Sequence, residues 1–369
     1  MYYRLPLENY LRKRLRQRQV LEAAACEVAV VQPEESEWCA QPAVHLAGQL
    51  ERAQKSVEGH ATLQEELQAC RPGLVTHAAV IRYRLRDAIV HRAGYDAPGF
   101  ANRIVSRASP LMSTREGAHI ERAVYCMSPV SRRYFGHWLQ DACATGLMKE
   151  QEDSLFLDER PDWSHCAAYS DAFGFSPVTA PTARVDLLTV YQDHGQGSSK
   201  RARYRRMRDL LRRAIPVDKP GPKAVYLRRG ATGAARLVAN DGAVSDALSR
   251  RGFTIVDLQD TSVAALHASL RHARLVVSMD GSHLNHIYTA ADPGTAILSF
   301  IPADRFTATN VGYCRAAGMR FGIQLAMPAP GGYQVDIDDM LRTLDLLEKA
   351  EAAPLASQTV HAGGTPSYA

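Results

Sequence analysis

The feature that most constrains this chain is a regular alternation of strand-like and helix-like segments between residues 223 and 326. Short apolar, β-branched runs alternate with segments that have the 3.6-residue periodicity of an amphipathic helix. The expected strands read KAVYLRR, FTIVDL, RLVVSM, TAILSFI and MRFGIQLA. Strands separated by single helices require right-handed crossovers and a parallel sheet. The sequence therefore predicts an α/β fold with a Rossmann-like domain in the C-terminal half.

The rest of the chain is less regular. At 369 residues it is too long for one typical core, so we expect a second domain. Strand patterns such as RAVYCMSP and RVDLLTVYQ surround helical ones in residues 71–215. Three prolines and a glycine within residues 216–222 predict a hinge. We expect five segments: an irregular, partly helical lead-in (1–70), an α/β domain (71–215), the Rossmann-like domain (216–335), a C-terminal helix (336–352) and a disordered tail (353–369).

Composition excludes several classes of protein. No apolar run approaches the roughly 18 residues of a membrane helix, and the N-terminus has no apolar signal-peptide region. The seven cysteines are scattered and form no CxxC pair, which disfavours a disulfide framework or a structural zinc site. A reducing cytosol fits this pattern. Hydrophobic residues make up 46% of the chain, as expected of a globular protein.

The net charge of +5 is mild, but it is clustered in residues 11–18 and 200–213. The second run carries eight basic residues and one acidic residue. Such runs are most often solvated helix faces, and they can also bind an anionic membrane surface, an acidic glycan or a nucleic acid. We rank nucleic acid last, because no aromatic residues interleave with the basic ones in the manner of an RNA or DNA module.

Polar side chains follow the first strand of the Rossmann-like domain. That strand delivers Arg228 and Arg229 to its end, and Arg236 and Asn240 follow in the loop. Ligands bind beyond the carboxyl ends of parallel strands, and guanidinium groups match the oxygens of a diphosphate. A solvated basic loop is the alternative on this segment alone.

The segment DGSHLNH follows the third strand. One interpretation is a tight turn at Gly281 and Ser282 that leads into a helix, whose free N–H groups receive a phosphate. Another is a metal site made by Asp280, His283 and His286, which is weaker because catalytic zinc sites usually draw a ligand from farther along the chain. We expect no metal here. His286 packed under the sheet is a further alternative.

The first domain has one dense candidate, SRRYFGHWLQDA. His137 and Asp141 are four residues apart and would share one helical face. A carboxylate paired with a histidine can act as a general base toward a hydroxyl. The alternative is a structural pair that stabilises the helix.

These three segments, in this order, resemble the family 61 glycosyltransferases, which include bacterial enzymes of capsular polysaccharide synthesis. The resemblance covers roughly residues 75–350. A YxHWLxD-like stretch is matched by Tyr134, Phe135, His137, Trp138, Leu139 and Asp141. A YxSRR and RxxxNE pattern is matched loosely by Tyr226, Arg228, Arg229, Arg236, Asn240 and Asp241. The HGAGLTN motif is matched in position by Asp280, Gly281, Ser282, His283, Leu284, Asn285 and His286.

The chain departs from the family pattern at three positions. Asp280 stands where the family often has histidine, and His286 where it often has asparagine. In the next strand, AILSFIP, Ser299 takes the place of the acidic residue that the family usually has in a VVELxP pattern. Recognition of the ribose or base of the nucleotide is therefore expected to differ, and the sugar, the nucleotide and the linkage do not follow from the resemblance.

The resemblance implies a GT-B-like architecture, in which two Rossmann-like domains face a cleft. It implies an inverting enzyme that generally works without a metal cofactor, with a nucleotide-sugar on the C-terminal domain and an acceptor on the other. Asp141 would be the base and His137 would orient it, while Asp280 is a rival base or, like Asn285, a sugar contact. The donor phosphates would be held by Arg228, Arg229, Arg236, Asn240, Gly281, Ser282, His283 and His286.

The expected function is the transfer of a sugar to a glycan or lipid-linked acceptor in bacterial surface polysaccharide synthesis. We expect a cytoplasmic protein, peripheral at the inner face of the membrane if its basic runs bind anionic lipid. The alternatives are a non-catalytic sugar-nucleotide or glycan-binding protein, a metal-dependent hydrolase, and a nucleic-acid binder.

Overall fold

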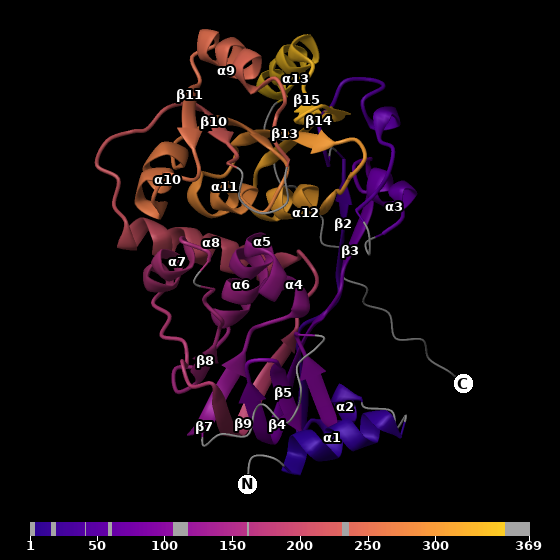
Figure 1. Ribbon diagram of the computed structural model, residues 1–369, viewed down its shortest axis with the longest axis vertical. Helices are drawn as coiled ribbons and strands as arrows, with labels where there is room; N and C mark the ends of the chain where they lie inside the picture. The colour runs from indigo at the N-terminus through magenta and orange to yellow at the C-terminus, as the bar shows by residue number, and fades with distance from the viewer. Residues whose placement is uncertain are drawn as a thin grey trace. The chain divides into compact units, whose positions relative to one another are not determined.

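The computed structural model describes residues 4–15, 20–40, 42–57, 61–105, 117–160, 162–230 and 236–350. These residues divide into two compact units, each built from two stretches of chain (Figure 1). The first unit joins residues up to Glu34 with His77–Gly195. The second joins Glu35–Thr76 with residues from Gln196 onward.

This division differs from the expected one at both ends of the predicted first domain. Residues 1–70 are not a separate lead-in, because β1 (Glu27–Gln32) pairs with β4 (Val80–His91) while Val44 bridges to Gly322 in the second unit. Residues 196–215 belong with the second unit rather than the first. Local sequence patterns identify a strand, but they carry no information on which sheet the strand joins.

The second unit contains the predicted parallel sheet. Its strand order is β11-β10-β12-β13-β14-β15, and β10 to β14 are all parallel. The bounds are β10 (Ala224–Arg228), β11 (Thr254–Asp257), β12 (Leu275–Met279), β13 (Ala296–Pro302), β14 (Arg320–Ala329) and the antiparallel β15 (Gly332–Gln334). The strand order reverses between β10 and β12. We call this place the switch point, where doubly wound sheets bind their ligands.

Helices cover both faces of this sheet (Figure 1). On one face α9 (Asp241–Arg250) and α13 (Ile337–Lys349) pack on a core that includes Leu275, Val277 and Met279 of β12. Alternate residues of a strand point to opposite faces, so Ser278 points to the other side. The remaining helices are α8 (Ser198–Ala214), α10 (Val263–Leu270), α11 (Leu284–Ala290) and α12 (Thr309–Ala316). Ser262 is the N-cap of α10, because its side chain accepts a hydrogen bond from the Ala265 amide.

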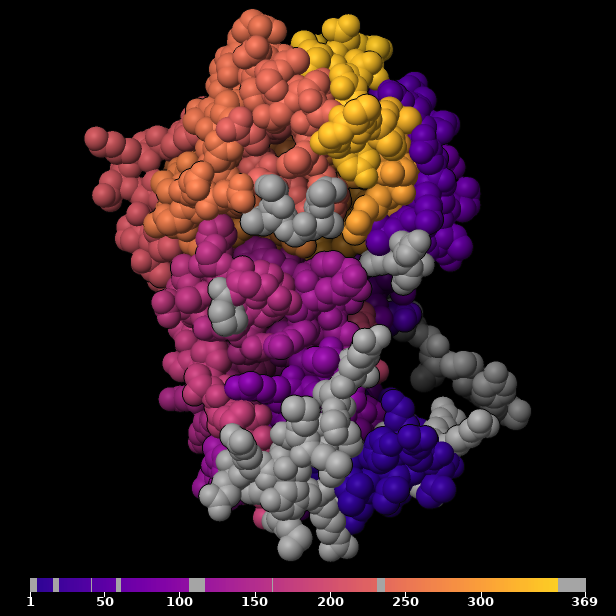
Figure 2. Space-filling model, in the orientation of Figure 1, coloured from indigo at the N-terminus to yellow at the C-terminus, as the bar shows by residue number. Residues whose placement is uncertain are grey.

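The stretch Glu35–Thr76 is an integral part of the second unit. Figure 2 shows its violet atoms beside the yellow atoms of the C-terminal elements. The side chain of Gln49 makes two bonds there: its Oε1 accepts from the Leu325 amide at 2.9 Å, and its Nε2 donates to Asp339 Oδ2 at 2.8 Å. The stretch contains β2 (Glu35–Cys39), η1 (Leu50–Arg52), α3 (Leu63–Gln68) and β3 (Gly73–His77), with β2 and β3 paired as a two-stranded sheet.

The first unit has a mixed sheet, so it lacks the all-parallel sheet expected of a second Rossmann-like domain. The order is β6-β5-β4-β9-β7-β8, with β1 also paired to β4. Only β7 with β8 and β7 with β9 are parallel among the described pairings. The bounds are β5 (Gly94–Ala97), β6 (Phe100–Arg103), β7 (Ala118–Tyr125), β8 (Ser154–Phe156) and β9 (Thr182–Gln192). The antiparallel half arises because β4 and β5 are joined by a tight hairpin.

The helix predicted to carry His137 and Asp141 is present, with an unexpected turn in its middle. It runs through α5 (Phe135–His137), a π-helical turn η3 (Trp138–Ala142) and α6 (Cys143–Gly146). Single π-helical turns are rare and occur frequently at functional sites. The other helices of this unit are α1 (Arg4–Arg14), α2 (Leu21–Ala24), α4 (Pro129–Arg133) and α7 (Cys166–Phe173).

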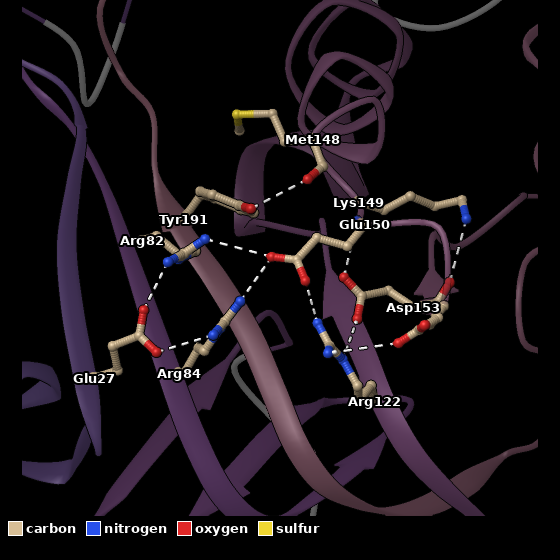
Figure 3. Close-up of polar contacts among 10 residues, drawn as sticks. Glu27, Arg82, Arg84, Arg122, Met148, Lys149, Glu150, Asp153 and Tyr191 are labelled. Atoms are coloured by element: carbon tan, nitrogen blue, oxygen red, sulfur yellow. Dashed lines mark hydrogen bonds and ion pairs between the residues drawn. The ribbon is translucent and has the colours of Figure 1, made fainter.

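One face of the first sheet carries a network of ion pairs, shown in Figure 3, which we call the sheet-face cluster. Three arginines and three carboxylates alternate in it: Arg82, Arg84, Arg122, Glu27, Glu150 and Asp153. Glu27 bonds Arg82 at 2.6 Å and Arg84 at 2.9 Å, and Glu150 bonds Arg84 at 2.7 Å. Each charge therefore meets an opposite charge from a neighbouring strand or loop.

The basic run at residues 200–213 is not simply a solvated helix face. It lies in α8, where buried Arg208 donates from Nη2 to the carbonyl oxygens of Tyr288 (3.1 Å) and Ala317 (3.0 Å). Arg201 pairs with Glu37 and Arg212 with Asp292, all within the second unit. Several arginines of α8 thus bind carbonyl or carboxylate groups of the second unit.

Parts of two expectations fall outside the described residues. The first basic run continues past α1, which ends at Arg14, into residues 16–18, and the predicted disordered tail is residues 353–369. Among the helices that the structure describes, none has the length and apolar character needed to span a membrane.

Candidate functional site

The switch point of the second sheet gathers polar residues from three strand ends. Arg229 directly follows β10, Asp280 directly follows β12, and Arg305 lies in the loop after β13. Arg236 enters from the loop that precedes α9. Carboxyl ends of parallel strands meet at one edge of a sheet, so this convergence follows from the topology. We call Arg229, Arg236, Arg305 and Asp280 the switch-point cluster.

Two arginines of this cluster meet at a single backbone oxygen. The Nη1 atoms of Arg229 and Arg236 both donate to the carbonyl oxygen of Asp280, each at 3.0 Å. Gly281 makes this approach possible. It has a φ of +156°, and a Cβ atom there would lie 2.2 Å from Arg229 Nη1. The glycine predicted to shape a turn is thus required for both its backbone conformation and the space it leaves.

The side chain of Asp280 is buried and fully engaged. Only 2% of the residue is exposed. Its Oδ2 accepts from Arg236 Nη1 at 2.6 Å, and its Oδ1 accepts from Asn310 Nδ2 at 2.7 Å. Asn310 in turn is contacted by the buried hydroxyl of Tyr288. Asp280 is therefore part of the scaffold that holds Arg236.

Arg305 is a residue that the sequence analysis missed. Burial, followed by the nearby charge of Arg236, lowers the pKa of Arg229 to about 10, and Arg305 also contributes to this lowering. The Nε atoms of Arg236 and Arg305 are buried and meet no hydrogen-bond acceptor among the described residues. The signal for Arg305 was present in the sequence, because it follows the strand TAILSFI by the same rule that identified Arg229.

His283 is held as a neutral ring with a defined tautomer. Ser278 Oγ donates to the carbonyl oxygen of Leu227 at 2.6 Å, so its single proton is used there. The 2.7 Å contact between Ser278 Oγ and His283 Nε2 must then be donated by the histidine, which leaves Nδ1 as an acceptor. Burial, followed by the charge of Arg229, keeps the pKa of His283 well below its usual value. In this state His283 supplies no positive charge to the phosphate that it is expected to hold.

Two of the predicted phosphate ligands are engaged elsewhere. Arg228 bonds both oxygens of Asp257 at 2.5 Å and also contacts Asp241 at 3.2 Å, and these partners raise its pKa. Asn240 donates to the carbonyl oxygen of Val335 and accepts from the amide of the same residue. Arg228 thus carries a locally balanced charge, and Asn240 joins the start of α9 to the segment after β15.

The rest of the turn that follows β12 is compact. Asn285 donates to the Ser282 carbonyl oxygen at 2.8 Å, and His286 is 1% exposed within α11. The structure does not assemble Asp280, His283 and His286 as metal ligands. In the described part of the chain, no group of three or more histidine, cysteine, aspartate or glutamate side chains is arranged to hold a metal ion.

His137 and Asp141 meet in the first unit as their spacing predicts. His137 Nδ1 lies 2.7 Å from Asp141 Oδ2. Both side chains are partly exposed, at 22% and 26%. The π-helical turn that contains Asp141 begins at the buried Trp138, whose ring stacks against Phe135. The pair is therefore a supported carboxylate with access to solvent, which is the arrangement that a general base requires.

Comparison with known protein families gives a match over part of the chain. Residues 135–298 match the sequence model of the family Glycosyltransferase 61. The chain carries a glycosyltransferase family 61 domain, and it is a glycosyltransferase. The family 61 match begins at Phe135 and so includes His137 and Asp141, and it continues through the turn at Gly281. It is shorter than the expected range of 75–350 and ends before Arg305 and Asn310. None of the curated proteins compared with the chain matches it.

Proposed function

We propose that this glycosyltransferase transfers a sugar, with inversion, from a nucleotide-sugar to a hydroxyl of a glycan or lipid-linked acceptor. The observation that carries the proposal is the gathering of Arg229, Arg236 and Arg305 at the switch point of a parallel sheet, in a chain with a family 61 domain. Guanidinium groups in a partly water-excluded site stabilise the charge that develops on a leaving diphosphate.

The donor phosphates would bind at the switch-point cluster. Arg229 and Arg236 approach from one side of the β12 end, and Arg305 approaches from the neighbouring strand end. The amides of Gly281, Ser282 and His283 have no acceptor among the described residues, and they supply further donors beside the arginines. Arg228 is excluded from our set of ligands because Asp257 and Asp241 already bind it.

The first unit would bind the acceptor and supply the base. Asp141 takes the proton of the acceptor hydroxyl while that oxygen attacks the anomeric carbon. The bond between this carbon and the donor phosphate oxygen breaks, and the diphosphate leaves with the electron pair. His137 donates from Nδ1 to Asp141 Oδ2 and fixes the carboxylate in orientation. We propose that protein cations offset the leaving-group charge without a metal ion.

We propose that the enzyme is GT-B-like in binding the donor and the acceptor on different units. We propose a cytoplasmic enzyme of bacterial surface polysaccharide or capsule synthesis, with peripheral membrane association supported by the exposed basic residues of α1 and α8. Liposome co-sedimentation that ignores anionic lipid content would remove the membrane part of the proposal.

A thermal-shift screen tests the proposal directly. UDP-, GDP-, CMP- and dTDP-sugars are each added with and without a divalent metal ion. A nucleoside diphosphate-sugar is expected to stabilise the protein without metal. Turnover with the same sugar then distinguishes a transferase from a protein that only binds it. A strict need for added metal contradicts the metal-independent mechanism.

A further inference from the structure

We propose that Asp280 is the resident counter-anion of the switch-point cluster: it positions the arginines in the absence of substrate and weakens their hold on the diphosphate. This inference rests on the proposed function, because it concerns the regulation of donor affinity at the same site. It gives Asp280 a role different from a catalytic base or a sugar contact.

The hydrogen bonds of Asp280 support the positioning role. Its carbonyl oxygen accepts from Arg229 and Arg236, and its Oδ2 accepts a second bond from the same Nη1 atom of Arg236. Asn310 fixes the other carboxylate oxygen at 2.7 Å. One residue thus holds two guanidinium groups with both its backbone and its side chain, and each carboxylate oxygen already accepts from the protein.

The charges of the cluster support the counter-anion role. Arg229, Arg236 and Arg305 repel one another in a setting where burial reduces screening by water. Asp280 is the buried carboxylate among them, and it offsets part of this repulsion when no ligand is present. A diphosphate bound by the same arginines lies close to that carboxylate and is repelled by it. The carboxylate therefore keeps the site assembled and eases the departure of the product.

Substitution of Asp280 by asparagine separates this role from the others. Asp280→Asn keeps the shape of the side chain and removes its charge. We expect the variant to bind inorganic pyrophosphate about tenfold more tightly than the wild type by calorimetry, because the repulsion is gone. Its melting temperature without ligand should fall, since three partly buried cations lose their buried anion. Pyrophosphate should restore more of the melting temperature in the variant than in the wild type.

A matched control and three outcomes decide the inference. Asp292→Asn removes a carboxylate that pairs with Arg212 outside the cluster, and it should leave pyrophosphate affinity unchanged. Unchanged pyrophosphate affinity with lost turnover in Asp280→Asn identifies a base and overturns the inference. Unchanged affinity with a raised KM for the donor identifies a sugar contact and also overturns it. Weaker pyrophosphate binding identifies a purely structural residue, with the same consequence.

Failure of the proposed function gives a different result. If neither the wild type nor the variant binds pyrophosphate or any nucleotide, the donor site itself is misplaced, and both proposals fall. If the wild type binds and the variant does not bind more tightly, only the counter-anion role is wrong.

A second pair of variants covers the case in which Asp280→Asn does not fold. Arg236→Gln leaves Asp280 without its charged partner, and we expect its pyrophosphate affinity to fall by about 100-fold. Combining Arg236→Gln with Asp280→Asn removes one charge of each sign. Affinity should then recover by about tenfold relative to Arg236→Gln alone. No recovery overturns the inference.

Discussion

The sheet-face cluster of the first unit and the switch-point cluster of the second unit each contain three arginines, but they differ in charge balance. In the sheet-face cluster Arg82, Arg84 and Arg122 alternate with three carboxylates. In the switch-point cluster two of the three arginines, Arg229 and Arg236, bond the one buried acid, Asp280. The first is a network in which each arginine pairs with a carboxylate, whereas the second has more arginines than carboxylates. A group of arginines therefore indicates a candidate anion site only once the partners of each arginine are known.

The largest effect is expected from the first unit, at a residue outside the sheet-face cluster. Asp141→Asn should lower kcat by roughly 10²–10⁴-fold, the usual contribution of a general base. Pyrophosphate binding should be unchanged, because the phosphate ligands lie in the second unit. Steady-state kinetics and calorimetry measure the two quantities. Near wild-type turnover in this variant would show that the base lies elsewhere.

Loss of a switch-point arginine is expected to have the next largest effect. Arg305→Gln should weaken binding of the donor nucleotide by about 10- to 100-fold, since a charge-assisted hydrogen bond contributes about 1.5–3 kcal/mol. Arg122→Gln in the sheet-face cluster is the matched control and should leave affinity within error. Equal losses in both variants would break the distinction between the clusters.

Crowding the switch point tests its geometry rather than its charge. Gly281→Ala places a Cβ atom 2.2 Å from Arg229 Nη1 and strains the backbone, so Arg229 must move. We expect donor affinity to fall by about tenfold, with about 1–3 kcal/mol less stability from the strained backbone. Gly252→Ala is a control at another positive φ with no atom within 4 Å of the added Cβ. It should cost stability without changing affinity, and a loss of affinity there would point to an indirect effect.

The pH dependence of stability tests the buried His283, which lies beside the switch-point cluster. The folded pKa of His283 is well below its unfolded value, so the unfolded chain binds the proton more readily. The stabilisation that neutral His283 provides is complete above the unfolded value of about 6.5 and is lost as the pH falls below it. His283→Gln should therefore lose less stability than the wild type between about pH 7 and about pH 5 in denaturant titrations. A parallel pH profile for the two proteins would contradict the buried neutral state.

The smallest effect is expected from the sheet-face cluster. Glu150→Gln disrupts pairs with Arg84 and Arg122 on a half-exposed surface. Such pairs contribute about 0–1 kcal/mol, so the melting temperature should change little and turnover should not change. A large loss of activity would show that this network takes part in function.

Sequence reasoning was most reliable where local pattern and topology agree. The periodicity of residues 223–326 predicted the parallel sheet, and the rule of carboxyl strand ends led to Arg229, Gly281 and Asp280. The same rule applied to the next strand would have found Arg305. The four-residue spacing of His137 and Asp141 correctly predicted their contact. Their roles in catalysis stay predictions.

Sequence reasoning failed where the partner of a charge lies far along the chain. Arg228 and Arg229 are neighbours in sequence, but their side chains have different partners: Asp257 of the adjacent strand holds Arg228, and the backbone of Asp280 holds Arg229. In the same way, α8 reads as a solvated basic helix although Arg208 bonds the ends of two other helices. The mixed first sheet was also missed, because strand direction depends on connections and not on composition.

The sequence by itself determined the parallel sheet of the second unit, the edge at which polar residues gather, and the family 61 character of the chain. These depend on local periodicity and on short motifs, which a single strand or helix already contains. The tertiary structure decided which arginines gather at the switch point and which pair closely with carboxylates. That decision requires contacts between residues tens to hundreds of positions apart. Asp280 is the clearest case, because an acid that looked out of place beside the predicted phosphate ligands proves to be bonded to Arg229 and Arg236.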